Sequence, residues 1–394
     1  MKTALVLSGG GARAAYQVGV LKALAEILPF YSHNPFPIIC GTSAGAINAA
    51  ALACSADHFR TGITQLENLW GNLHIEQVQR AGFADLFLGS LKLVGAFFHR
   101  GVSYGRPLSL FDNTPLYHLL LDNIPLHNLQ RLIDENHLHA LCITALGYST
   151  GHSINFFQGH KSIESWKRAR RTGVRCGLTH QHIMASSALP AIFPAVRIHR
   201  EFFGDGAIRQ TTPMSAALHL GASKLLVIGA SRHNVSIPRT DVTHSPSLAQ
   251  IFTQLLSSAF IDSVEEDIST MERFNRFLME IEPGKRAQIQ AQPVDVLALS
   301  PSISFDEIAL RHVKYLPRSM RIFLKTIGAT RKTGGSSITS YLLFEAHYCQ
   351  ELMDCGYADG LAQADKIREF MVACPLASGC PTPSAPPFGD VLPV

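Results

Sequence analysis

A serine flanked by glycines is the residue in this sequence best placed for nucleophilic chemistry. Ser43 lies in the pentapeptide GTSAG at 41–45, between a short apolar run and a stretch of small residues. A G-x-S-x-G pentapeptide between a strand and a helix is typical of a nucleophile elbow, a sharp turn that exposes the serine hydroxyl. The glycines of the elbow, Gly41 and Gly45, relieve backbone crowding in such a turn. The pattern predicts that Ser43 lies beside a helix N-terminus, where negative charge is favoured.

A glycine cluster near the N-terminus is the second chemical feature. Gly9, Gly10 and Gly11 follow an apolar run at 3–7 and precede a helical apolar pattern. A glycine-rich turn that opens a helix presents several backbone N–H groups in one direction, which suits a phosphate or the oxyanion of an acyl-transfer intermediate. Arg13, in the first helical turn, would add a positive charge there. A tight strand–helix turn without a ligand is the alternative for this segment taken alone.

The glycine cluster also matches parts of two nucleotide-binding motifs, but the residues around it argue against both. A dinucleotide fingerprint needs an acidic residue about twenty positions after the glycines. No Asp or Glu lies between Glu26 and Asp57. A P-loop needs Lys followed by Ser or Thr after its last glycine, whereas Gly11 is followed by Ala12-Arg13-Ala14. The sequence therefore favours an oxyanion-binding turn over a nucleotide site.

A nucleophilic serine needs a base, and an acidic residue in a glycine turn is the candidate. Asp205 lies between Gly204 and Gly206, after an apolar pair, where its carboxylate would point across a sheet. A turn-forming role without chemistry is the alternative for an aspartate in this setting. Upstream, residues 185–194 (ASSALPAIFP) form another stretch of small residues punctuated by prolines.

In combination these motifs resemble the patatin-like phospholipase family. The matching pieces occur in the family's order within roughly residues 1–235, and they are GGGARA at 9–14, GTSAG at 41–45, the block at 185–194 and DGA at 205–207. The family usually has a glycine at the position of Ala14.

The resemblance implies a serine lipid acyl hydrolase that cleaves carboxyl esters of phospholipids or related lipids. It implies a Ser–Asp dyad without an essential histidine, in which Ser43 is the nucleophile, Asp205 is the base and an acyl-enzyme forms. It also implies that the glycine cluster, with Arg13, is the oxyanion hole. Some hydrolases of this family need an activator, so a protein activator joins a lipid substrate among the expected partners.

Three alternatives stay open. A Ser–acid–His triad is one, because several of the 18 histidines follow Asp205, although none lies in a distinctive turn motif. A soluble esterase or thioesterase without a membrane role is another. The third is a non-catalytic family member that binds lipid or a protein partner through the same pocket, and the presence of Ser43 and Asp205 argues against it.

Composition favours a compact enzyme with a large core. The chain has 394 residues, of which 46% are hydrophobic and 16% are charged, and its net charge of +4 is too small to indicate nucleic-acid binding. No H-E-x-x-H or paired C-x-x-C signature is present, so we expect no metal ligands and no cofactor. Eight cysteines without a regular framework and no visible signal peptide favour the cytoplasm. Secretion without an N-terminal signal is also compatible with the sequence.

Apolar runs that alternate with helical patterns predict an α/β fold. We expect a patatin-like layered fold with a central, largely parallel sheet flanked by helices, plus a mainly helical C-terminal region. The expected strands are at 3–7, 37–40, 141–145 and 224–229, with a further one at 294–299. The expected organisation is a catalytic domain at 1–235, a linker or loop at 236–247, the helical region at 248–372 and a disordered proline-rich tail at 373–394.

Two segments are candidates for contact with a membrane surface. Residues 308–344 contain no Asp or Glu, and Arg318, Arg321 and Lys325 would share one helical face, which suits an anionic lipid surface. Residues 83–99 would form a largely apolar helix that Lys92 interrupts, so we expect no transmembrane span. For this helix, packing on the core is the favoured interpretation, and a mobile cap that admits acyl chains is the alternative. For the basic segment, a solvated helix face is the alternative.

Overall fold

The structure is a computed structural model that describes most of the chain. The residues that it does not describe are 1, 29–33, 81, 84, 87, 92–107, 231–247, 259–262, 283–284, 286–291, 330–336 and 373–394. The expected linker at 236–247, the expected tail at 373–394 and the second half of the helix expected at 83–99 therefore lie outside the described residues.

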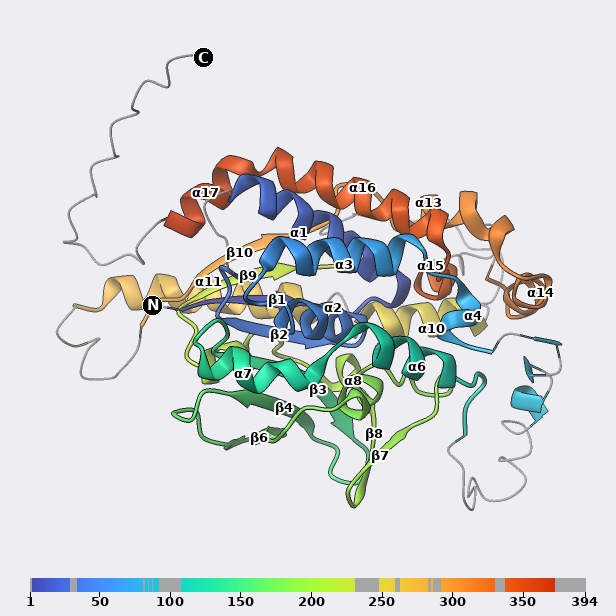
Figure 1. Ribbon diagram of the computed structural model, residues 1–394, viewed down its shortest axis with the longest axis horizontal. Helices are drawn as coiled ribbons and strands as arrows, with labels where there is room; N and C mark the ends of the chain where they lie inside the picture. The colour runs from blue at the N-terminus through green and yellow to red at the C-terminus, as the bar shows by residue number, and fades with distance from the viewer. Residues whose placement is uncertain are drawn as a thin grey trace, which may run out of the picture.

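A ten-stranded sheet organises the described part of the chain (Figure 1). Its strands follow in the order β10-β9-β1-β2-β3-β4-β6-β5, with β8 paired to β3 and β7 paired to β8. Neighbours from β10 to β3 run parallel, and β4 is the first antiparallel neighbour along this order. The strand bounds are β1 (Thr3–Leu7), β2 (Ile38–Thr42), β3 (Ala140–Gly147), β4 (Ser153–Gly159), β5 (Trp166–Arg168), β6 (Arg171–Arg175), β7 (Val196–Ile198), β8 (Glu201–Asp205), β9 (Lys224–Ile228) and β10 (Asp295–Leu299). The predicted α/β fold with a largely parallel central sheet is confirmed.

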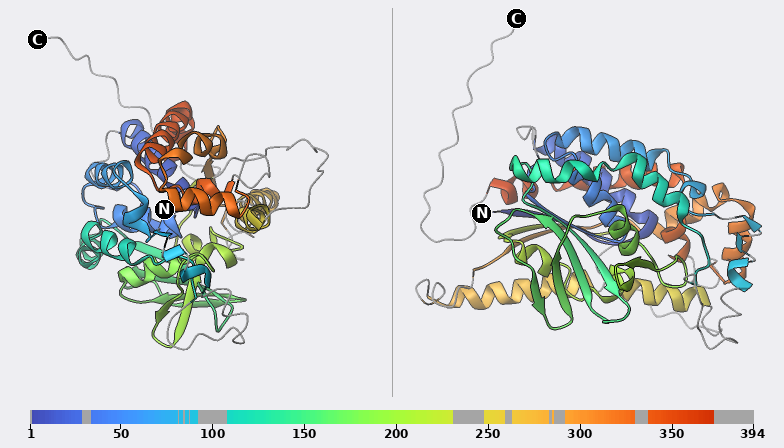
Figure 2. Two further views of the ribbon diagram at one scale, coloured as in Figure 1. Left: turned by 90° about the vertical axis from the view of Figure 1, so that its right-hand side faces the viewer. Right: turned by 60° about the horizontal axis from the view of Figure 1, so that its bottom comes forward.

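Helices cover both faces of this sheet (Figures 1 and 2). The longer ones are α1 (Ala15–Ile27), α2 (Ala44–Ala53), α3 (Phe59–Gly71), α6 (Thr114–Asn123), α10 (Leu248–Ser257), α11 (Ser263–Glu280) and α16 (Ala346–Ala362). The shorter ones are α4 (Ile75–Val78), α7 (Leu129–Asp134), α8 (His180–Ser186), α9 (Ser215–His219), α13 (Phe305–His312), α14 (Arg318–Thr326), α15 (Ser337–Leu342) and α17 (Ala364–Val372). Single 3-10 turns are η1 (Gly11–Ala14), η2 (Leu126–Asn128), η3 (Gly206–Arg209) and η5 (Val313–Tyr315).

The apolar run of β1 divides between two cores. Successive side chains of a strand point to opposite faces of a sheet. Leu5 and Leu7 accordingly belong to the larger core, under α1, α2, α3 and α16. Ala4 and Val6 belong to a smaller core on the opposite face, where residues of α9 and α11 cover the sheet. An uninterrupted apolar strand is what a sheet buried on both faces requires.

The C-terminal helices share the larger core with the N-terminal segment. Helix α16 lies along α1 (Figure 1), and their backbones approach so closely that no side chain fits between them at two positions. A Cβ atom on Gly356 would lie 2.1 Å from the carbonyl oxygen of Tyr16, and one on Gly19 would lie 1.8 Å from that of Met353. Strand β10 also extends the sheet beyond β9. Residues 292–372, where described, are therefore continuous with the sheet and core formed by residues 2–230.

Both candidate membrane segments present apolar side chains to solvent. In α14, Met320 and Leu324 are buried, whereas Ile322 is 56% exposed among the exposed side chains of Arg318, Arg321 and Lys325. The described part of the segment at 83–99 is helical at 88–91, and three of its large apolar side chains are exposed, those of Phe83, Leu88 and Leu91. In the described part of the chain, no helix combines the length and apolarity needed to cross a bilayer.

The α1–α16 contact leads to a stability prediction. Gly356→Val is expected to lower the free energy of unfolding by ~1–3 kcal/mol or more, because the new side chain has no space against α1. Thermal unfolding of the purified variant measures this. Gly177→Ala is the matched control, since a Cβ there would meet no atom within 4 Å. Equal melting temperatures for the two variants would show that the helices do not approach this closely.

Candidate active site

The register of three strands brings Ser43 and Asp205 together. Strand β2 pairs with β3 as far as Thr42, which lies opposite Thr144. Strand β8 then pairs with the next residues of β3, and Asp205 lies opposite Ala145. Because β4 occupies the other edge of β3 over the same residues, β2 and β8 follow one another along a single edge. The residue after β2 and the last residue of β8 are therefore neighbours.

Ser43 occupies the sharp turn between β2 and α2. Its backbone has φ 55° and ψ −130°, a conformation that L-residues rarely adopt and that stores strain. Gly45, in the first turn of α2, allows the turn to lie against β1, because a Cβ there would be 2.4 Å from the carbonyl oxygen of Leu7. Gly41 is the last residue of β2 that pairs with β1, and it lies opposite the same Leu7. This local geometry is that of a nucleophile elbow.

A buried serine from the block at 185–194 holds the elbow in place. The Ser43 N–H donates to Ser186 Oγ at 2.8 Å, and Ser186 Oγ donates to the carbonyl oxygen of Thr144 at 2.6 Å. Ser186 ends α8 and is fully buried. The sequence singled out this block without assigning any residue a role. A serine among small residues carries no local signal for such a contact, so Ser186 was missed.

The two candidate catalytic side chains are in direct contact. Ser43 Oγ donates to Asp205 Oδ2 at 2.6 Å, and the Ala207 N–H donates to Asp205 Oδ1 at 2.9 Å. Asp205 is fully buried and Ser43 is 2% exposed. A hydroxyl within hydrogen-bond distance of a fixed carboxylate is the arrangement in which the carboxylate can remove the hydroxyl proton.

Burial decides the protonation of Asp205. Desolvation raises the pKa of its carboxyl to about 7, although the hydrogen bonds from Ser43 and Ala207 act in the opposite direction. A carboxyl with a pKa near neutrality can accept a proton and return it at neutral pH, which is the property required of a general base.

No histidine in the described ranges donates to, or accepts from, either Ser43 or Asp205. The buried His182 instead forms hydrogen bonds with Thr179, and burial lowers the pKa of its imidazole to about 4. His233 and His244 lie outside the described residues. Among the residues that are described, no group of three or more His, Cys, Asp or Glu could hold a metal ion.

The glycine cluster forms a buried turn next to the elbow. Ser8, before it, is held by β9 through its N–H and hydroxyl, which both donate to the carbonyl oxygen of Ile228. The Arg13 N–H closes the turn onto the carbonyl oxygen of Gly10 at 3.1 Å. For the N–H groups of Gly9, Gly10 and Gly11, the described residues provide no hydrogen-bond acceptor. Of the three glycines, Gly11 lines a pocket that Ser43 also lines.

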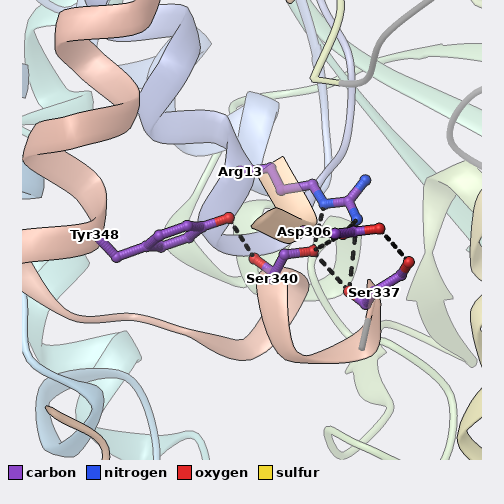
Figure 3. A network of polar contacts seen from close by, with 5 residues as sticks. All are labelled: Arg13, Asp306, Ser337, Ser340 and Tyr348. Carbon is purple, nitrogen blue, oxygen red and sulfur yellow. Dashed lines mark hydrogen bonds and ion pairs between the residues drawn. The ribbon is translucent and has the colours of Figure 1, made fainter. Parts of the chain in front are cut away.

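The side chain of Arg13 makes contacts other than the one with an oxyanion that the sequence predicted. Its guanidinium pairs with Asp306, in the C-terminal part of the chain (Figure 3). It also lies over the ring of Tyr341, in the same part of the chain. The positive charge that was expected to face an oxyanion is thus engaged by a carboxylate.

An apolar pocket opens at Ser43. Its polar side chains are those of Ser43, Ser187 and Tyr341, and the hydroxyl of Ser187 is buried with no hydrogen-bond partner among the described residues. The other lining side chains are apolar and come from several helices and the segments between them, and they are Ala44, Ile47, Leu69, Trp70, Leu73, Val78, Leu116, Leu119, Leu120, Leu189, Phe193, Leu342 and Phe344. A pocket of this composition suits a hydrocarbon chain whose polar end meets Ser43.

The raised pKa of Asp205 predicts a pH-dependent stability difference. The unfolded carboxyl has a pKa of about 3.9, so between about pH 4 and about pH 7 the folded chain keeps a proton that the unfolded chain releases. Stability therefore falls as pH rises through this window. Asp205→Asn removes the buried charge. Its gain in melting temperature over the unmodified chain is expected to be larger at about pH 8 than at about pH 5, and a constant gain would contradict the raised pKa.

A family model and two related proteins all connect this chain by name with phospholipases. The sequence model described as Patatin-like phospholipase matches residues 5–218. A cGAMP-activated phospholipase of Pseudomonas aeruginosa is 30% identical over 220 residues, which are 55% of this chain and 55% of that protein. The calcium-independent phospholipase A2-gamma of Rattus norvegicus is 24% identical over 338 residues, 80% of this chain and 38% of that protein. The chain thus spans about half or less of the length of these relatives.

Two solved structures are more distant. VipD from Legionella pneumophila matches with a TM-score of 0.38 and 15% identity, covering 93% of this chain and 67% of that chain. Human GIVD cytosolic phospholipase A2 matches with a TM-score of 0.38 and 13% identity, covering 94% and 59%. With TM-scores this low, we draw no conclusion about function from either structure. The family match, by contrast, spans more than half of the 394 residues and contains both Ser43 and Asp205, so the chain belongs to the patatin-like phospholipase family.

Proposed function

We propose that this chain is a serine lipid acyl hydrolase that cleaves carboxyl esters of phospholipids or related lipids. The observation that carries the proposal is the 2.6 Å hydrogen bond from Ser43 Oγ to Asp205 Oδ2 at an apolar pocket. Both relatives named above are phospholipases by name. Family membership and an apolar pocket together favour an acyl chain as the group that enters.

The proposed reaction has two halves. In the first, the proton of Ser43 Oγ passes to Asp205 while Oγ bonds to the ester carbonyl carbon, whose oxygen becomes an oxyanion. The N–H groups of the glycine turn would stabilise that oxyanion, and losing one such donor commonly lowers the rate ~10²–10³-fold. The carbon–oxygen bond to the leaving alcohol then breaks, and the alcohol takes the proton from Asp205.

In the second half, water replaces the alcohol. Asp205 accepts a proton from the water as its oxygen attacks the acyl-enzyme carbonyl. The tetrahedral adduct collapses, Ser43 Oγ regains the proton, and the fatty acid leaves. Asp205 serves as base in both halves, so its carboxylate must be ionised at the start of each. This requirement, together with the pKa of about 7, makes the reaction slower below neutral pH.

Activation is part of the proposal. The Pseudomonas relative is named for activation by cGAMP, which is a statement about that protein. In this chain Ser43 is 2% exposed and Asp205 is fully buried, so a bulky lipid has little access to the dyad. We therefore include in the proposal that an activator, either a protein or a lipid surface, opens the pocket.

A membrane role is favoured over that of a soluble esterase or thioesterase by one observation. The exposed face of α14 combines Ile322 with the basic side chains of Arg318, Arg321 and Lys325. An apolar side chain among cations is the combination that binds the surface of an anionic bilayer, where the cations meet phosphates and the apolar group enters the interface.

The dyad is tested with a fluorophosphonate probe, which reacts with activated serines. The unmodified chain is expected to be labelled and to release fatty acid from phospholipid vesicles, whereas Ser43→Ala and Asp205→Asn should each lose at least ~10³-fold in both assays. Ser149→Ala, on an exposed turn, is the matched control and should behave as the unmodified chain does. Full activity of either dyad variant, with folding verified by thermal unfolding, would refute the proposed mechanism.

The membrane surface is tested by flotation with anionic vesicles. Replacing Arg318, Arg321 and Lys325 together by glutamine is expected to lower vesicle binding up to ~100-fold, at about 1 kcal/mol for each cation near the surface. The matched control removes three exposed cations from another surface, Lys161, Lys167 and Arg168. Equal losses for the two triple variants would mean that α14 is not the contact surface. Failure of the unmodified chain to float would favour the soluble esterase.

A further inference from the structure

A buried polar network connects the glycine turn to the C-terminal part of the chain (Figure 3). Arg13 Nη2 lies 2.7 Å from Asp306 Oδ1 in α13, and Arg13 Nε donates to Ser340 Oγ in α15 at 2.8 Å. The guanidinium carbon lies 3.8 Å from the centroid of the Tyr341 ring. One cation from the N-terminal segment is thus enclosed by three residues that lie about three hundred positions further along the chain.

The network is closed by hydrogen bonds among its C-terminal members. Ser340 Oγ donates to Asp306 Oδ1 at 2.9 Å, and Ser337 Oγ donates to Asp306 Oδ2. Tyr348 donates its hydroxyl hydrogen to the carbonyl oxygen of Ser340 at 3.3 Å. Asp306 therefore fixes both the start of α15 and the guanidinium of Arg13.

The ion pair between Arg13 and Asp306 matters for the local structure because the guanidinium is buried. The Arg13 side chain is only 7% exposed and that of Asp306 is 30% exposed. A buried guanidinium is stable only when an anion and hydrogen-bond acceptors compensate its lost hydration. Loss of the Asp306 charge would leave Arg13 buried without its anion, so Arg13 and the backbone that carries it would shift.

That backbone is the glycine turn. Arg13 is in η1, which begins at Gly11, and its own N–H bonds to the carbonyl oxygen of Gly10. Tyr341 and Leu342 of α15 line the pocket together with Gly11 and Ser43. The C-terminal segment thus forms one wall of the pocket and also holds the guanidinium adjacent to the turn.

We propose that Asp306 is a positioning residue that fixes the oxyanion-binding turn through Arg13, and that residues 337–344 complete the active site. These residues all lie beyond the family match, which ends at 218. This inference rests on the proposed function, because it takes the glycine turn as the group that binds the oxyanion. It gives residues 337–344 a role in the chemical step, in addition to their contribution to the hydrophobic core.

A second carboxylate provides the matched control. Asp359 of α16 accepts a hydrogen bond from the Tyr16 hydroxyl of α1 at 3.0 Å and another from the Ser302 N–H at 2.9 Å. It connects α1, the helix that follows η1, to the same C-terminal part, but it belongs neither to the network nor to the pocket lining. Asp306→Asn and Asp359→Asn therefore remove the same group from two comparable contacts.

The first test is kinetic. Asp306→Asn is expected to lower kcat for phospholipid hydrolysis at least ~10-fold with little change in KM, because a displaced oxyanion donor weakens only the transition state. Asp359→Asn should change kcat less than twofold. If Asp306→Asn does not fold, Ser340→Ala replaces it with the same expected direction, because it removes the acceptor of Arg13 Nε and a donor to Asp306 but leaves both charges of the ion pair. Equal kcat values in the two aspartate variants at equal melting temperature would overturn the proposal.

The second test does not depend on activity. Hydrogen exchange of the peptide spanning residues 8–15 should be faster in Asp306→Asn than in Asp359→Asn, while the β9 peptide at 224–228 exchanges equally in both. Equal exchange of the 8–15 peptide would refute positioning by Asp306 even if the chain hydrolyses lipid. Conversely, a chain that shows the exchange difference but neither reacts with fluorophosphonate nor hydrolyses phospholipid, even with anionic vesicles and cell extract as sources of an activator, would refute the lipid hydrolase and retain the positioning role.

Discussion

The burial of one carboxyl group is the constraint on which the site depends. Asp205 is fully buried, and its oxygens accept hydrogen bonds from the Ser43 hydroxyl and the Ala207 N–H. A carboxylate removed from water is unstable unless donors are fixed around it. Strand β8 therefore has to continue the edge of β3 at the point where β2 ends, and Ser186 has to hold the elbow against β3. The strain at Ser43 persists because this surrounding structure determines its backbone completely.

Much of the fold was predictable because its signals are local. The apolar runs at 3–7, 141–145 and 224–229 became β1, β3 and β9, and even the isolated run at 294–299 became β10. The elbow was identifiable because a strained strand–helix turn restricts residue types within five positions. The family assignment from the combined motifs is confirmed by the match over residues 5–218.

The remaining features were not predictable, because they depend on contacts between residues distant in the chain. Nothing near Arg13 indicates that its partner is Asp306, and an arginine in a glycine turn was naturally assigned to the oxyanion. Ser186 lies in a block that was noticed for its composition, yet its acceptor role depends on the position of Ser43. The pocket lining comes from helices whose apolar faces would look the same if they only packed on the core.

The central position of β1 has a consequence for synthesis of the chain. This strand pairs with β2 on one side and with β9 on the other, and α1 packs against α16 near the opposite end of the sequence. During synthesis, β1 therefore has an unpaired edge until β9 has been translated, and α1 stays uncovered until α16 has been translated. Such non-local topology slows folding and favours protection by chaperones. It also means that a chain that stops before Tyr341 lacks that wall of the pocket.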